Sequence, residues 1–132
     1  MSPEERAVLD DFSRRHGLQV LHVSPGGAGM DSKSFFCSGP DILLHAFSYR
    51  MEWHAYLATP GSPMQWFGIH LIYDFLKIDD PGLDLRMESH LAGLDTHWDR
   101  IATTIREWWP FFSWHSNKVR AHLERRSSDS ES

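Results

Sequence analysis

Residues 42–58 read ILLHAFSYRMEWHAYLA, and this stretch decides the fold because it predicts two strands joined by a tight turn. Apolar side chains alternate with polar or aromatic ones on both sides of the turn, the pattern of a sheet with one buried face. If the loop is centred on Tyr49-Arg50, with two or four residues, the numbers of facing residues sum to 99. This register places His45 opposite His54 on the outer face of an antiparallel hairpin.

The segments before the hairpin predict one helix and two more strands. Residues 2–5, SPEE, form a capping box with proline at the first helical position, so we expect a helix over residues 3–16. Residues 18–23 and 32–37 have the length and apolar content of strands, and the glycine-rich loop 24–29 connects them. These strands extend the hairpin into a sheet.

After the hairpin, residues 62–65, SPMQ, repeat the capping box with an internal proline. This signal predicts a helix over residues 63–77 that is apolar almost all round and therefore buried. The β-branched and aromatic residues of 67–73 leave a strand open as the alternative over that part.

The most regular helical pattern of the chain comes next, because six apolar residues repeat at intervals of three and four. They are Leu91, Leu94, Trp98, Ile101, Ile105 and Trp108. We expect one helix to carry them and to end at Pro110. A last helix is predicted over residues 111–126, and the polar residues 127–132 are expected to form a disordered tail.

Together these elements predict an α+β fold. It consists of an N-terminal helix, a small antiparallel sheet of three to four strands, and then three helices packed on one face of the sheet. The chain of 132 residues is long enough for one hydrophobic core and too short for two. We therefore expect one globular domain over residues 1–126.

Composition narrows the class of function. The chain carries 18 acidic and 13 basic residues, a formal net charge of −5, which opposes binding to nucleic acid or anionic membrane over the surface as a whole. Its only cysteine, Cys37, excludes an internal disulfide framework and is typical of a reducing compartment. The charged N-terminus is unlike a signal peptide, and no apolar run approaches the roughly 18 residues of a membrane span. We expect a cytoplasmic protein that does not bind membrane and for which the overall charge disfavours nucleic acid as a partner.

The negative charge is concentrated in residues 70–99, which carry seven acids and two bases. The acids are Asp74, Asp79, Asp80, Asp84, Glu88, Asp95 and Asp99. A surface of this kind attracts a basic partner and raises its association rate. We predict that these residues form a partner-binding site, with an ordinary solvated helix face as the alternative.

Histidines form the second candidate site. The predicted register gathers His45, Glu52, His54 and Tyr56 on the outer face of the hairpin. Two imidazoles and a carboxylate can bind zinc or exchange protons, so this face is the alternative, ligand-binding or enzymatic, site. The spacing matches no metal motif, and histidines also fill such faces beneath a covering helix or protein. No metal, cofactor or catalytic residue is therefore predicted.

A third cluster surrounds Pro110, where residues 108–114 read WWPFFSW. These aromatic side chains cannot all face the core around a helix-breaking proline, so we expect Trp109 or Trp114 to be partly exposed. Basic residues follow in 118–126, an arrangement that suits single-stranded nucleic acid or a protein partner. A core corner where two helices meet is the simpler explanation.

In size, acidity and aromatic content, the chain as a whole resembles the immunity proteins of bacterial polymorphic toxin systems. The resemblance is carried by the acidic stretch 74–99, by the hairpin face with Glu52 and His54, and by the run DTHWD at 95–99. It is a likeness of type, without a specific family motif. The resemblance implies a non-enzymatic protein that binds a cognate toxin domain and masks its active site. Such toxins are often basic nucleases, for which an acidic surface is the complement.

Overall fold

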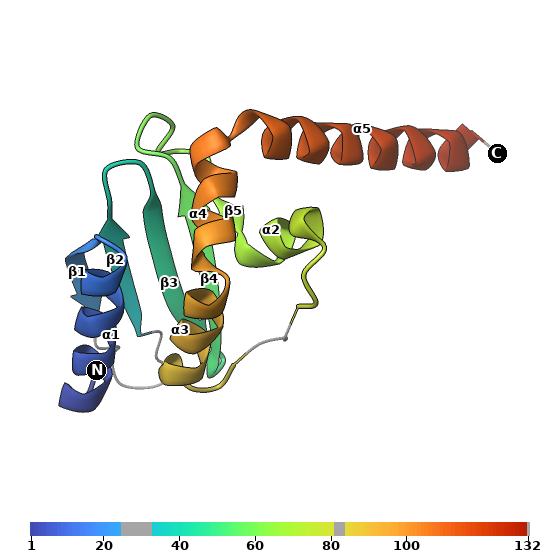
Figure 1. The fold of residues 1–132 in the computed structure, drawn as a ribbon. Coiled ribbons are helices and arrows are strands. Elements are labelled where there is room, and N and C mark those ends of the chain that lie inside the picture. The colour runs from blue at the N-terminus through green and yellow to red at the C-terminus, as the bar shows by residue number, and fades with distance from the viewer. Residues whose placement is uncertain (25–32, 81–83, 132) are drawn as a thin grey trace.

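The computed structural model describes residues 1–24, 33–80 and 84–131 and has an α+β fold (Figure 1). Its elements are α1 (Pro3–Arg15), β1 (Gln19–Ser24), β2 (Ser34–Ser38), β3 (Leu43–Tyr49), β4 (Glu52–Ala58), β5 (Phe67–Gly68), α2 (Ile69–Leu76), α3 (Met87–Thr96), α4 (Trp98–Glu107) and α5 (Trp109–Glu131). The α+β class is confirmed. The predicted element count is wrong, because the described residues form five strands and place four helices after them.

Helix α1 begins as the capping box predicts. The backbone N–H of Ser2 donates to Glu5 Oε1 at 2.9 Å, and the backbone N–H of Glu5 donates to Ser2 Oγ at 3.1 Å. Two donors that the helix itself leaves unpaired are thereby satisfied. The apolar side of α1 buries Leu9 and Phe12 completely, and this fixes the helix against the sheet.

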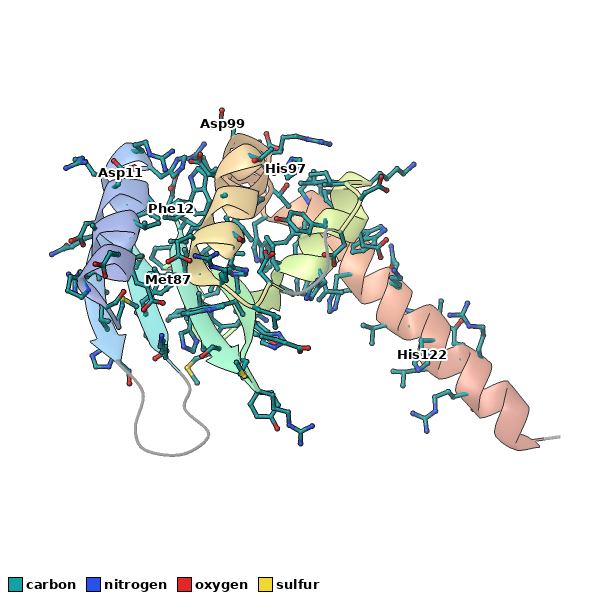
Figure 2. The ribbon with its side chains drawn as sticks, turned by 90° about the horizontal axis from the view of Figure 1, so that it is seen from below. Asp11, Phe12, Met87, His97, Asp99 and His122 are labelled. Atoms are coloured by element: carbon teal, nitrogen blue, oxygen red, sulfur yellow. The ribbon has the colours of Figure 1, made fainter. Side chains whose placement is uncertain are left out.

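The five strands form an antiparallel meander in the order β1-β2-β3-β4-β5. Alternate residues of β3 and β4, among them Leu44, Ala46, Trp53 and Leu57, are buried in the core. Helices α1, α3 and α4 lie over this face of the sheet, as Figure 2 shows from below. Within ranges 1–24, 33–80 and 84–131, no helix lies over the other face. The predicted loop 24–29 lies, except for its first residue, outside the described residues.

The predicted register of the hairpin is wrong by two residues. Leu44 pairs with Leu57 and His45 with Tyr56, so the partner numbers sum to 101. The loop is Arg50-Met51, and both residues have positive φ angles of 52° and 68°, which is the backbone of a tight hairpin turn. Because a shift of two preserves side-chain alternation, the buried and outer faces are nevertheless as predicted.

The capping box predicted at Ser62 does not start a helix. Phe67 and Gly68 instead pair with Leu57 and Tyr56 and complete the sheet as β5, and α2 begins only after Gly68. The helix predicted over residues 63–77 and the strand predicted over 67–73 are therefore each partly right. The backbone hydrogen bonds that β4 gains at its edge outweigh the local helix signal.

The single helix predicted through Leu91 and Trp108 is two helices, because the backbone leaves the helical conformation at His97 (φ −113°, ψ 13°). The apolar stripe continues across this break, and five of its six residues are buried while Trp108 is half-buried. The buried side chains thus keep the predicted spacing of three and four residues, although the backbone forms two helices instead of one. Helix α5 continues to Glu131, through five of the six residues of the predicted tail, and the disorder of residues 127–132 stays a prediction.

The turn offers a direct test of the observed register. Left-handed backbone costs non-glycine residues about 1–2 kcal/mol each, so replacing Arg50→Asn and Met51→Gly together should raise the free energy of unfolding by about 1 kcal/mol. Urea denaturation measures this, with Tyr49→Gly as the control that should destabilise. A double variant less stable than wild type would contradict the turn.

Candidate functional site

The outer face of the sheet presents a continuous group of aromatic rings. Period-two alternation sends Phe36 of β2, His45 and Phe47 of β3, and Tyr56 of β4 to the side opposite the core. Trp66, just before β5, reaches over the same face and lies edge-on to Phe36 at 6.0 Å between ring centroids. We call these five residues and His54 the open face.

The rings of the open face are stacked on one another. Phe36 and His45 lie 4.0 Å apart with planes within 4° of parallel, and Phe47 lies 5.8 Å from Tyr56 with planes within 7°. Phe47 also stacks on His54 at 5.4 Å. Stacking in this geometry holds the rings in place. The open face is thus an ordered, largely aromatic surface. Helices α1, α3 and α4 lie on the opposite side of the sheet and do not cover it.

The structure brings the predicted alternative site of His45, Glu52, His54 and Tyr56 to one face, but it changes their pairing. His45 faces Tyr56, His54 faces Phe47, and Glu52 faces Tyr49. The two imidazoles are therefore diagonal neighbours with the Phe47 ring in contact with both. Burial lowers the pKa of His45, which keeps its imidazole neutral at pH 7. In this environment the rings of His45 and His54 contribute to the stacked aromatic surface.

Four of the seven predicted acidic residues form ion pairs or hydrogen bonds inside the chain. Asp74 pairs with Lys118, Glu88 with Arg86, and Asp95 with Arg15, while Asp80 is engaged by a hydrogen bond with the His70 ring. Within the described residues, the remaining three, Asp79, Asp84 and Asp99, form no ion pair. All seven belong to α2, to α3, to α4 or to the segments that join them, on the helical side of the molecule.

Asp95 is the most strongly engaged of these acids. Its Oδ1 accepts from Arg15 Nη1 at 2.6 Å and lies 2.6 Å from His16 Nε2. The hydrogen bond from Arg15, followed by that from His16, lowers the pKa of Asp95. Since Arg15 belongs to α1 and Asp95 to α3, this cluster links two helices of the layer and is not free for a partner.

Sequence reasoning missed a small polar cavity where α2 and α3 meet β4. His70, Tyr73, Asp80, Asp84 and His90 line it, and its free volume of about 10 Å³ admits about one water molecule. His90 is 7% exposed, and its Nε2 has no hydrogen-bond partner in the described part of the chain. Its position near the edge of an apolar stripe, seven residues before His97, was visible in the sequence, but the cavity depends on the tertiary fold.

Burial dominates the electrostatics of this cavity. It lowers the pKa of His90 to about 4, with smaller contributions from His54 and His70. It also raises the pKa of Tyr73 to about 12, together with the carboxylates of Asp80 and Asp84. Both side chains are therefore neutral at pH 7. The cavity thus holds a neutral imidazole and a neutral phenol beside the carboxylates of Asp80 and Asp84.

Comparisons with protein-family models, with curated proteins and with solved structures found no match for the chain. Over the described ranges 1–24, 33–80 and 84–131, no group of three or more histidine, cysteine, aspartate or glutamate side chains is placed to hold a metal ion. None of the helices in those ranges combines the length and the apolar character that crossing a membrane requires.

His90 should make stability depend on pH. The folded state keeps it neutral down to about pH 4, whereas the unfolded chain binds a proton below about pH 6.5, so stability present above pH 6.5 is lost as the pH falls toward 4. The full loss is about 3 kcal/mol. Urea denaturation from pH 7.5 to 4 should show a flatter profile for His90→Leu than for wild type. Parallel profiles would refute this assignment.

Proposed function

We propose that the protein is a non-enzymatic protein-binding module whose open face is a contact surface. The observation that carries this proposal is the stack of aromatic rings on a sheet face that the helical layer leaves bare. Contiguous apolar surface of this kind on a soluble domain marks an interaction site. Tyrosine, tryptophan and phenylalanine supply much of the binding energy at protein interfaces, because they bury large areas at little entropic cost.

The shape of the open face supports binding over catalysis. The principal pockets among the described residues lie on the helical side and at its margins, and His45, Glu52, His54 and Tyr56 line none of them. Enzymes and small-ligand sites generally enclose their substrate in a concave pocket. A surface of stacked rings instead fits the flat or convex surface of another protein.

We further propose that the chain neutralises a basic partner, a cognate bacterial toxin domain, through its helical side. Asp79, Asp84 and Asp99 have charges that no ion pair within the described residues offsets. Asp99 lies at the end of the helical layer away from the sheet (Figure 2). The acidic side and the open face therefore point in different directions, and one chain can use both.

Charge reversal tests the acidic side. The partner is isolated by co-purification with the tagged chain and identified by mass spectrometry. The triple variant Asp79→Lys, Asp80→Lys and Asp84→Lys should then slow association at low salt by about tenfold or more, since steering depends on the local charge. The matched control reverses three exposed acids elsewhere, Glu4→Lys, Asp10→Lys and Glu107→Lys. An equal rate for triple variant and wild type would remove these residues from the contact surface.

One observation favours a second candidate function, a ligand site at the histidines of the open face. His54 Nε2 is buried and has no hydrogen-bond partner among the described residues, so it can accept a bond or ligate a metal. A zinc titration followed by thermal unfolding separates the candidates. For the protein-binding module the midpoint should stay unchanged. A zinc-dependent rise that His54→Gln abolishes, and that the control His22→Gln retains, would favour the ligand site.

A further inference from the structure

Helix α5 leaves the body of the molecule as a projecting arm (Figure 1). Its first turns are anchored, because Phe111 is buried and Trp114 lies against Phe75 at 5.4 Å. Its direction is set at Trp108, whose unusual backbone (φ 42°, ψ −55°) ends α4 and whose ring stacks on Phe112 at 4.5 Å. We define residues 116–127 as the arm.

The arm has an apolar side that its own chain leaves in solvent. Val119 is 44% exposed and Leu123 is 58% exposed. Together with Phe112 they follow helical spacing, since they lie seven and four residues apart on one side of α5. A helical segment of this length without tertiary packing is marginally stable in water. The arm therefore requires a surface to cover Val119 and Leu123.

The open face lies on the side toward which the arm extends. In Figure 2, α1, α3 and α4 lie on one side of the strands, and α5 runs outward and away from that layer. The arm and the open face both carry exposed apolar side chains, Val119 and Leu123 on the arm and Tyr56 on the open face.

We propose that a second copy of this chain covers these side chains, with the arm of each copy lying across the open face of the other. The inference rests on the proposed function, because it takes the open face to be a protein-contact surface. It adds the identity of the protein that occupies this surface. A two-fold exchange of this kind is self-complementary and closes the assembly at two chains. Each copy then covers the two apolar surfaces that the other leaves exposed.

Charge complementarity favours a second copy as the occupant. The arm carries four bases and one acid, a net charge of +3. The open-face strands β2, β3 and β4 contain no lysine or arginine and one carboxylate, Glu52. Pairing two arms side by side would bring like charges together. When the arm of one copy packs against the open face of the other, this repulsion is avoided.

The dimensions of the two surfaces also agree. Twelve helical residues span about 18 Å, and five strands at their usual spacing span about 19 Å from the first to the last. An arm laid across the strands therefore reaches over the rings of the open face. The acidic helical side points away from the contact, so the dimer leaves it accessible to a basic partner.

Sedimentation velocity over a range of concentrations tests the assembly. Each chain has a mass of 15.3 kDa, and the wild type should sediment as a dimer. Val119→Ser with Leu123→Ser should shift the protein to monomer while the sheet stays folded, as unchanged hydrogen-exchange protection of the β3 amides would show, since both side chains are exposed. Asn117→Ser, on the opposite side of the arm, is the matched control and should remain dimeric.

The outcomes separate this inference from the proposed function. A monomeric wild type, or a dimer that the arm variant retains, overturns the inference and leaves the proposed partner to be tested by charge reversal. A dimer lost with Tyr56→Ser but kept by the arm variant also overturns it, while showing that the open face binds protein. A monomer retained on heparin at physiological salt, and released by Arg120→Glu with Arg126→Glu, would make the arm a polyanion site instead.

Disulfide cross-linking identifies the contact itself. Cys37 is buried and burial raises the pKa of its thiol, so introduced cysteines react selectively. A mixture of chains bearing Tyr56→Cys with chains bearing Leu123→Cys should form a covalent heterodimer under mild oxidation. Replacing Leu123→Cys by Asn117→Cys is the control, and equal cross-linking in both mixtures would contradict the proposed placement of the arm.

Discussion

The pairing of β3 with β4, fixed by the turn at Arg50 and Met51, is the constraint on which the rest of the structure depends. It decides which side chains of both central strands face the helices and which face outward. Leu44 and Leu57 meet in the core as a consequence, and Phe47 comes to lie between His54 and Tyr56 on the other side. The core and the open face are thus two results of one register.

The two sides of the sheet differ in how they are completed. On the core side, the buried faces of α1, α3 and α4 cover the strands, and the Asp95 cluster ties α1 to α3. On the other side, stacked rings make a fixed surface that no helix of the described residues covers. Burying such a surface in another protein is favourable because the rings are already ordered, so association costs little additional side-chain entropy. This physical difference underlies the assignment of the open face as the contact surface.

The sequence allowed the local elements and the faces to be predicted, because both depend on short-range signals. The capping box at Ser2 and the alternation in β3 and β4 are of this kind. The turn was placed wrongly because Arg50-Met51 lacks the asparagine or glycine that marks such turns. The two-residue strand β5 is too short to show a period, and the break at His97 is hidden because the apolar stripe runs through it.

The candidate sites were predictable only in part, for a related reason. Alternation alone brought His45, His54 and Tyr56 to one face, but their contacts with Phe36 and Phe47 depend on the register. The ion pairs that engage Asp74 and Asp95 join segments distant in sequence, and so does the cavity around His90. Long-range contacts of this type follow from the assembled fold rather than from local pattern.

The central claim is that the open face is covered by protein, in the first instance by the arm of a second copy. An isotope-filtered nuclear Overhauser experiment on an equal mixture of labelled and unlabelled chains tests it most directly, because it records only contacts between copies. The account predicts intermolecular signals from the methyl groups of Val119 and Leu123 to the rings of Tyr56 and Phe47. A filtered spectrum without these signals, at concentrations where the wild type is dimeric, would contradict it.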